Sequence, residues 1–163
     1  MSAQFRSAVL FVRDMAASRH FYEHLLCQKV DMNFGVNVGY VGGLSLWDVQ
    51  AAAEVVFHRA PDGGTALGRD NLEIYFETED LEAMLQLLTT AGVKLVHPIV
   101  EHPWAQRALR AYDPDGHIVE LGEPMQATVR RLAAGGLSKE EIQGRTYMPL
   151  PAIEQMLAGE ATG

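Results

Sequence analysis

The chain has 163 residues, of which 48% are hydrophobic and 21% are charged, and its formal net charge is −8. This composition is typical of one folded domain with an appendage and excludes a largely disordered chain. The acidic balance argues against nucleic acid or an anionic membrane as the main partner. A single cysteine, Cys27, excludes an internal disulfide; its apolar neighbours predict that it is buried and unreactive. Without a secretory leader or an apolar run of about 18 residues, the sequence predicts a cytoplasmic protein.

The first half of the chain opens with a strand and a helix. Residues 7–13 (SAVLFVR) are rich in β-branched and aromatic side chains, and Asp14 is a candidate N-cap for the next segment. A helix is predicted over 15–27, because apolar side chains recur on one face at helical spacing: Phe21, Tyr22, Leu25 and Leu26. From about residue 28 to 49, glycines separate short strand-like runs.

The second half repeats this plan after a Gly- and Asp-rich loop at 61–71. LEIYFETE alternates with period two, Asp80 follows as a cap, and a helix runs from 81 to Gly92. The runs VKLVHPIV, AQRALRAY and HIVEL supply further strands. Two βαβββ repeats, at about 5–60 and 70–122, are therefore predicted within a domain spanning 1–124. The expected fold class is α+β, with a curved mixed sheet around a cleft and helices outside it.

The last segment, 125–163, is predicted to be a helical extension, with a capping box from Ser138 to Glu141. Its three short helices are compatible with a DNA-binding helix-turn-helix. However, the segment balances four basic against four acidic side chains, and the part after Met148 contains Glu154 but no Lys or Arg. DNA binding therefore stays a minor alternative. We expect a homodimer with this extension at or near the interface, since its amphipathic surface would otherwise be exposed.

Two stretches resemble the vicinal oxygen chelate superfamily, the group of glyoxalases, bleomycin-resistance proteins and extradiol dioxygenases. FVRDMAASRHFYEHLL (11–26) resembles the opening strand and helix of that superfamily, and HPWAQRALRAYDPDGHIVEL (102–121) resembles its closing hairpin. The resemblance covers about residues 5–122. It implies the two-repeat fold, and it leaves the chemistry open because this fold hosts many activities.

In metal-using members, the resemblance implies four ligand positions, two per repeat. Here they fall on Ser7, about Leu46, Glu73 and Glu120. Two carboxylates could hold a weakly bound Mg²⁺ or Mn²⁺, but they make a poor zinc or iron site. The expected cofactor is therefore none or a weakly bound divalent metal, with Glu73 and Glu120 as its candidate ligands.

Alternation along 73–79 places Glu73 and Tyr75 on one face of a strand. We expect this face to line the cleft, together with Ser7 and Phe11 of the matching strand. Two other interpretations stay open. Glu73 could lie in water at a strand end, and Glu120 could pair with an arginine, Arg107 or Arg110, on the neighbouring strand.

The loop before the closing hairpin predicts a recognition set of Trp104, Gln106 and Arg107, which offers a flat apolar surface, an amide and a fixed cation. Whether Gln106 or Arg107 points inward depends on a register of one residue. Trp47 and Tyr40 are candidates for the opposite wall, with core packing as the alternative.

The leading hypothesis is a glyoxalase/bleomycin-resistance-like protein that binds a small organic molecule without a full catalytic metal site. The alternative is a glyoxalase-type lyase or isomerase, or a related dioxygenase. In a lyase or isomerase, Glu120 or Glu73 would act as a general base, with a divalent ion or Arg107 stabilising the enediolate.

Overall fold

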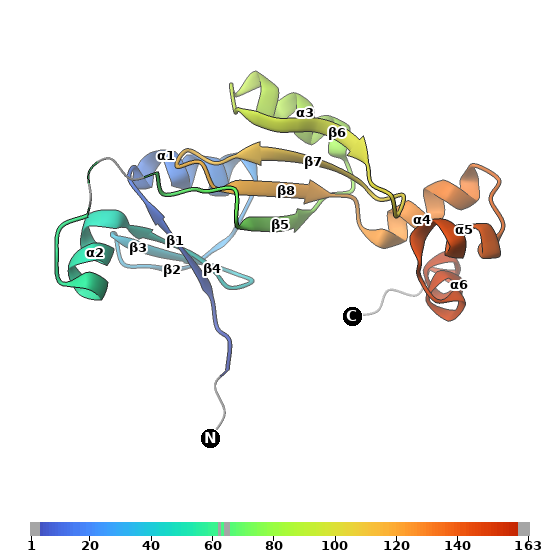
Figure 1. Cartoon of the computed structure of the whole chain (residues 1–163), viewed down its shortest axis with the longest axis horizontal. Coiled ribbons are helices and arrows are strands. Elements are labelled where there is room, and N and C mark those ends of the chain that lie inside the picture. The colour runs from blue at the N-terminus through green and yellow to red at the C-terminus, as the bar shows by residue number, and fades with distance from the viewer. Residues whose placement is uncertain (1–3, 62, 64–65, 160–163) are drawn as a thin grey trace. The chain divides into compact units, whose positions relative to one another are not determined.

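The computed structural model describes residues 4–61, 63 and 66–159, and these form two compact units (Figure 1). Unit 1 contains the chain up to Leu72 together with Tyr112–Ile118, and unit 2 contains Glu73–Ala111 together with the chain from Val119 onward. The two four-stranded sheets have the strand orders β1-β4-β3-β2 (sheet A) and β5-β8-β7-β6 (sheet B). The predicted α+β fold, with one strand-and-helix set per repeat and a helical C-terminal segment, is confirmed.

Sheet A has one core face and one open face. Unit 1 consists of β1 (Ala8–Val12), α1 (Met15–Arg19), η1 (His20–Leu25), β2 (Val30–Asn33), β3 (Asn37–Tyr40), β4 (Leu44–Asp48) and α2 (Val49–Phe57). β1 runs parallel to β4, so that Leu10 pairs with Leu46 on the buried face, and Phe11 pairs with Trp47 on the other. Leu46 therefore belongs to the core, and it does not occupy a ligand position on the open face.

The first helix begins as predicted and then changes its hydrogen-bonding pattern. Asp14 caps it by accepting a hydrogen bond from the Ala17 backbone N–H at 2.9 Å. From His20 onward the helix is a π-helix, and the Leu26 N–H bonds to the Phe21 carbonyl five residues earlier. The helix ends two residues earlier than predicted. Cys27 follows with a φ of 53° and is exposed, so the prediction of a buried cysteine is wrong.

α2 has no counterpart among the predicted elements. Asp48 caps it through hydrogen bonds from the backbone N–H groups of Gln50 and Ala51, both at 3.0 Å. Its small residues Ala52 and Ala53 are buried. The helix ends at His58, which adopts a left-handed conformation with φ of 53°.

The turn at Asp113–Gly116 is anchored in unit 1 by one buried carboxylate. Asp113 accepts hydrogen bonds from the Tyr22 hydroxyl at 2.9 Å and from the His117 backbone N–H at 2.8 Å. The turn also packs against the backbone of Gly68, where a Cβ atom would lie 1.9 Å from the Gly116 carbonyl carbon. Only glycine fits at position 68 without moving this turn.

Sheet B also separates two faces. Unit 2 consists of β5 (Glu73–Glu77), α3 (Leu81–Thr90), β6 (Leu95–Glu101), β7 (Arg107–Tyr112), β8 (Ile118–Gly122), α4 (Met125–Ala134), α5 (Lys139–Thr146) and α6 (Leu150–Ala158). Asp80 caps α3 as predicted, accepting from the Ala83 N–H at 2.8 Å. Leu81 and Leu88 of α3 are fully buried. The apolar side chains of β7 and β8, including Leu109 and Val119, are buried with them.

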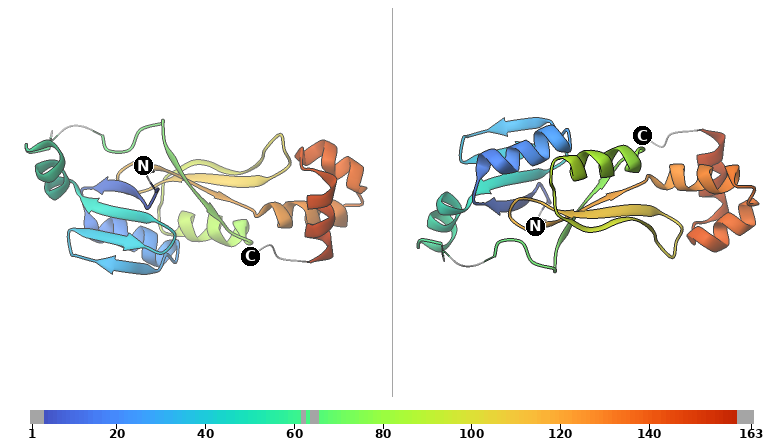
Figure 2. Two further views of the ribbon diagram at one scale, coloured as in Figure 1. Left: turned by 90° about the horizontal axis from the view of Figure 1, so that it is seen from below. Right: turned by 90° about the horizontal axis from the view of Figure 1, so that it is seen from above.

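The three C-terminal helices pack together at one end of sheet B (Figure 2). Their apolar side chains form a small core of their own, in which Val129, Ile142 and Ile153 are completely buried. The predicted capping box is present, since the Ser138 hydroxyl and the Glu141 carboxylate each accept from the other's backbone N–H. The amphipathic faces on which a dimer interface was predicted are therefore partly covered within the subunit. No helix in the described part of the chain is long and apolar enough to cross a membrane.

Candidate functional site

One face of sheet B carries α3, and the opposite face carries a connected set of polar and aromatic side chains, which we call the polar face. Period-two alternation along β5 separates Glu73, Tyr75 and Glu77 from the half-buried Ile74 and Phe76. Hydrogen bonds and ring contacts join the members of the polar face, which are Glu73, Tyr75, Glu77, His97, His102, Trp104, Gln106, Arg110 and Glu120.

Arg110 is the centre of the polar face. Its Nε donates to Glu73 Oε2 at 2.8 Å, and its Nη2 forms a short contact with Glu120 Oε2. Its Nη1 lies 3.2 Å from Nε2 of His97 and 3.3 Å from Nε2 of His102. The strand pairing of His97 with Arg110 sets this geometry. One guanidinium therefore bridges two carboxylates and contacts two imidazoles.

The two carboxylates differ in their environment. The Arg110 hydrogen bond holds the pKa of Glu73 below its usual value, and the Glu73 side chain is 43% exposed. Burial raises the pKa of Glu120, whose side chain is only 6% exposed, although the Arg110 charge acts in the other direction. The Glu73 carboxylate is thus the one that an incoming molecule can reach.

His102 is predicted to remain neutral at neutral pH. Burial lowers its pKa, and the nearby Arg110 and His97 lower it further. In an NMR titration the His102 ring should therefore change protonation below the usual histidine midpoint of about 6.5. Replacing Arg110 by Ala should move that midpoint upward, and an unchanged midpoint would contradict the contact at 3.3 Å.

Trp104 is held as a flat surface beside this cluster. Its indole stacks on the His102 ring with centroids 4.5 Å apart, and its Nε1 donates to Gln106 Oε1 at 2.9 Å. The Gln106 amide in turn donates to the Tyr75 hydroxyl at 3.0 Å and to the Glu123 carbonyl at 2.8 Å. Gln106 is 7% exposed and acts by positioning the two aromatic rings, which are themselves 38% (Trp104) and 46% (Tyr75) exposed.

Arg107 lies on the other face, so its predicted place in the recognition set is wrong. Its Nη1 donates to Glu82 of α3 at 2.7 Å, and its Nε donates to Glu123 at 3.2 Å. Strand alternation turns neighbouring side chains to opposite faces, and this resolves the register: Gln106 points to the polar face and Arg107 to α3.

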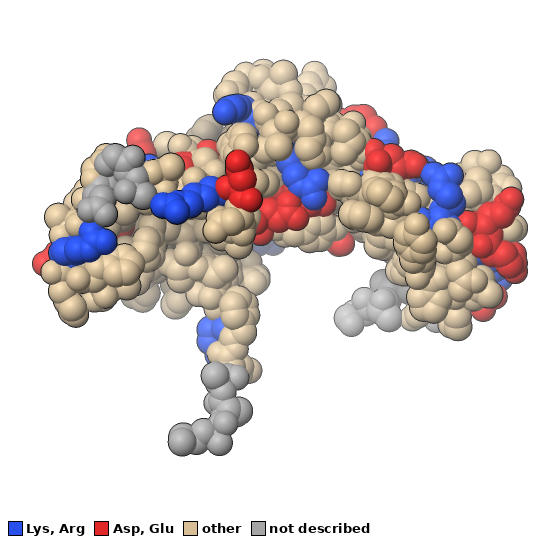
Figure 3. All heavy atoms as spheres, viewed as in Figure 1, with Lys and Arg blue, Asp and Glu red and all other residues tan. Residues whose placement is uncertain are grey.

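Glu123 is a buried carboxylate that the sequence analysis does not single out. It accepts from the Thr128 hydroxyl at 2.9 Å and from Arg131 Nη2 at 2.6 Å, as well as from Arg107. Arg131 also pairs with Glu101, and acidic and basic side chains lie beside one another around α4–α6 (Figure 3). These bonds join α4 to the beginning of β7 and the end of β8.

The remaining predicted site residues lie in unit 1. The rings of Phe11 and Trp47 meet edge to face with centroids 6.2 Å apart on the open face of sheet A. Ser7, just before β1, lines a separate pocket of about 400 Å³ with Ser45 and Gly39. Tyr40 is buried at 3% exposure, with its hydroxyl bonded to Glu23, which agrees with core packing.

The predicted metal ligands do not fit a resident metal ion. Glu73 and Glu120 are brought together, but the guanidinium of Arg110 bridges their carboxylates and would repel a divalent cation. Across the described residues, no group of three or more His, Cys, Asp or Glu side chains is arranged to hold a metal. Arg110 supplies the positive charge that pairs with both carboxylates.

Comparison with known proteins gives a consistent family and fold. Residues 5–126 match the model of the glyoxalase-like domain. A protein of unknown function from Agrobacterium tumefaciens str. C58 is 34% identical, with a TM-score of 0.70 over 76% of this chain and 96% of that chain. No curated protein matches the sequence.

Two more distant structures share the fold. A glyoxalase-related enzyme from Fulvimarina pelagi is 23% identical, with a TM-score of 0.62 over 75% of this chain and 88% of that one. A lactoylglutathione lyase from Agrobacterium tumefaciens is 19% identical, with a TM-score of 0.55 over 75% of this chain and 94% of that one. At these identities the likeness extends to the fold alone.

Proposed function

The chain belongs to the glyoxalase-like domain family. We propose that it binds a small planar organic amine on the polar face of sheet B. The observation that carries the proposal is the charge of the polar face, where the single guanidinium of Arg110 bridges Glu73 and Glu120 and leaves a net negative charge for recognition. The protein would then act by holding its ligand rather than by transforming it.

A planar ligand is supported by the two aromatic rings. Trp104 and Tyr75 are both partly exposed, and the bonds from Gln106 fix them before any ligand arrives. A ring held in place loses little conformational freedom on binding, so stacking retains more of its favourable free energy.

A ligand with an amine or other hydrogen-bond donors is supported by the charges. Glu73, Glu77 and Glu120 supply three carboxylates to the polar face, against the one guanidinium of Arg110. Glu73 and Glu77 are exposed, and they flank Tyr75 on β5. The excess of acceptors favours a cation over an anion.

A matched pair of probes tests this proposal: 1-naphthylmethylamine and 1-naphthoate share a ring and differ in the sign of their charge. The chain has two tryptophans, so in the variant Trp47→Phe the only indole N–H signal comes from Trp104. We expect the amine to shift that NMR signal and to bind at least about tenfold more tightly than the acid. Trp104→Ala should weaken the amine by about tenfold, as lost stacking predicts.

The matched control is Phe34→Ala, which removes an aromatic ring that is 71% exposed in unit 1. It should leave binding of the amine unchanged. Equal binding of amine and acid, or equal effects of the two alanine variants, would contradict the proposal.

The alternative function, a glyoxalase-type lyase or isomerase, is favoured by one observation. Burial raises the pKa of Glu120, as a general base near neutral pH requires. Against it, the same carboxylate is bound to Arg110 and only 6% exposed. Turnover of an α-ketoaldehyde hemithioacetal that disappears in Glu120→Gln, or stoichiometric Zn, Ni or Fe in protein purified without chelator, would favour the enzyme.

A further inference from the structure

The loop that carries Trp104 is a tight turn between β6 and β7. The His102 backbone N–H donates to the Gln106 carbonyl at 2.8 Å, and the Ala105 N–H donates to the His102 carbonyl at 2.8 Å. Ala105 adopts the left-handed conformation, with a φ of 65°. Glycine is preferred at such a position, because a Cβ atom makes this conformation costly. The cost of alanine here is offset if its methyl group makes a contact that glycine lacks.

The three C-terminal helices supply that contact. Ala105 is completely buried and belongs to the small core of the helical segment, where it is grouped with Val129, Leu132, Ile142 and Ile153. A residue of the β6–β7 turn is thus part of the hydrophobic core of α4, α5 and α6. The turn is anchored to these helices by its least favourable backbone position.

Hydrogen bonds from two arginines strengthen this anchor. Arg131 Nη2 of α4 donates to the Ala105 carbonyl at 2.6 Å, and its Nη1 donates to Glu101, the last residue of β6, at 3.2 Å. Arg145 of α5 donates to the other carboxylate oxygen of Glu101 at 2.8 Å. The helical segment therefore holds the turn both at its start and near its end.

This anchor bears on the polar face because Trp104 directly precedes Ala105. The Trp104 indole stacks on the His102 ring and donates to Gln106, and these two residues close the turn. Its ring is 38% exposed, so the turn rather than a surrounding core determines where the indole lies. Movement of Ala105 would displace the indole from its stacking position.

We propose that the C-terminal helices set the affinity of the polar face, with Ala105 and Arg131 as positioning residues that hold Trp104 in place for its ligand. The inference rests on the proposed function, which supplies the ligand, a planar amine. Arg131, α5 and α6 lie beyond residue 126, where the match to the glyoxalase-like domain ends. This control of affinity is therefore an addition to the family domain.

Replacing Ala105 by Gly tests the anchor, because glycine keeps the left-handed turn and removes only the buried methyl group. In the parent chain Trp47→Phe, Trp104 is the only indole. Without ligand, Ala105→Gly should raise the quenching of Trp104 fluorescence by acrylamide, since a released ring is more accessible. It should weaken binding of 1-naphthylmethylamine by about threefold, less than the tenfold expected of Trp104→Ala, because the ring is displaced and not removed.

The matched control is Ala133→Gly. Ala133 of α4 packs against the same core, so the variant removes a methyl group from the helical segment without touching the turn. It should leave both the quenching of Trp104 and the affinity for the amine unchanged. Equal changes in Ala105→Gly and Ala133→Gly would overturn the role of Ala105, because general loosening of the helices would then suffice.

Arg131→Gln provides a second, independent variant. It removes the hydrogen bond to the Ala105 carbonyl and should change both measurements in the same direction as Ala105→Gly. Arg130→Gln is its control, because the neighbouring Arg130 donates within the helical segment, to the Met156 carbonyl at 3.3 Å. Equal effects of the two arginine variants would overturn the role of Arg131.

A double-mutant cycle separates positioning from an unrelated loss of binding. If Ala105 acts through Trp104, then Ala105→Gly should cause no further loss of amine binding in a chain that already carries Trp104→Ala. Losses that multiply would show that Ala105 acts by another route and would overturn the proposal.

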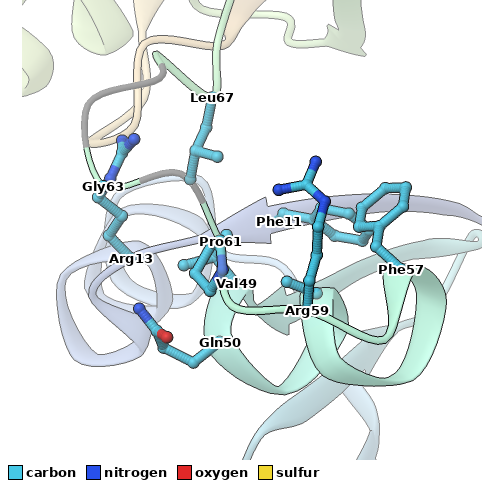
Figure 4. Close-up of a pocket in the computed structure, with 10 residues that line it drawn as sticks. Phe11, Arg13, Val49, Gln50, Phe57, Arg59, Pro61, Gly63 and Leu67 are labelled. Atoms are coloured by element: carbon cyan, nitrogen blue, oxygen red, sulfur yellow. The ribbon is translucent and has the colours of Figure 1, made fainter.

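One further control concerns unit 1, where Figure 4 shows a pocket whose lining includes the ring of Phe57. Phe57→Ala should leave the affinity for the amine unchanged. A loss as large as that of Ala105→Gly would assign the probe to this pocket and overturn its assignment to the polar face.

The two measurements fail in distinguishable ways. A folded parent chain that does not bind the amine would overturn the proposed function. Unchanged quenching of Trp104 in Ala105→Gly and Arg131→Gln, with both variants folded by thermal melting, would overturn the anchoring by the helices, whichever ligand the polar face takes.

Discussion

Replacing Arg110 by Ala is expected to lower the free energy of unfolding by about 3–5 kcal/mol at neutral pH. Glu120 would remain almost completely buried without the cation that balances its charge. Glu73 contributes less to this loss, because its side chain is 43% exposed and solvent screens its pairing with Arg110. Chemical denaturation of the variant beside the wild type measures the difference.

The loss in Arg110→Ala should depend on pH in a defined direction. Without the guanidinium the pKa of Glu120 rises further, and a carboxyl with a raised pKa in the folded state is stabilising at low pH and loses that contribution as pH rises. The gap between variant and wild type should therefore be widest at neutral pH and shrink in acid. Glu120→Gln combined with Arg110→Ala should recover part of the stability, since the buried charge is gone.

An exposed arginine supplies the control for this prediction. Arg130→Ala removes a guanidinium whose Nε bonds to the Met156 carbonyl at 3.3 Å, and it should change stability by less than about 1 kcal/mol. If Arg110→Ala behaves like Arg130→Ala, the bridge between Glu73 and Glu120 does not stabilise the fold.

Replacing Glu123 by Gln is expected to cost about 2–3 kcal/mol and to loosen α4 from sheet B. Burial opposes the charged form of Glu123, yet the bonds from Arg131, Thr128 and the Arg107 backbone hold its pKa below the usual value. Because the pKa of Glu123 is lowered in the folded state, its carboxylate stabilises the fold at pH values above the ordinary carboxyl pKa. This contribution is lost as the pH falls through the folded-state pKa. The cost of the substitution should therefore shrink in acid.

Limited proteolysis and denaturation together measure this effect, with cleavage near α4 expected to be faster in Glu123→Gln. Glu101→Gln is the matched control, because Glu101 also pairs with Arg131 but its side chain is 39% exposed. It should cost less than about 1 kcal/mol. Equal losses in the two variants would show that the burial of Glu123 adds nothing to the attachment of α4.

The repeat was predictable because its signals are local. Asp14 and Asp80 cap the first helix of their repeats as expected, and period-two alternation assigned the faces of β5 correctly. The predicted elements include no helix at 49–57, although Asp48 followed by an alanine-rich run is a helix-start signal. The switch to a π-helix at His20 depends on packing, and no local pattern announces it.

The site was harder to predict because its centre depends on register. Gln106 directly precedes β7 and is in phase with Ala108 and Arg110 of that strand, so the choice that sends Gln106 to the polar face also sends Arg110 there. One residue of shift would have exchanged Arg110 for Arg107. β6 pairs with β7 through two irregularities, and a linear pattern could not have placed His97 and His102 on the same guanidinium.

The anchoring of the Asp113 turn in unit 1 has a consequence for synthesis on the ribosome. Tyr22 emerges early, but its acceptor Asp113 belongs to a segment that is made only after Glu73–Ala111 of unit 2. At about 5–20 residues per second, the first unit must wait several seconds for this segment. Until then the Tyr22 hydroxyl lacks its native acceptor. The two repeats, despite their common plan, are therefore expected to complete their sheets together, as the nascent chain passes Gly122 at the end of β8.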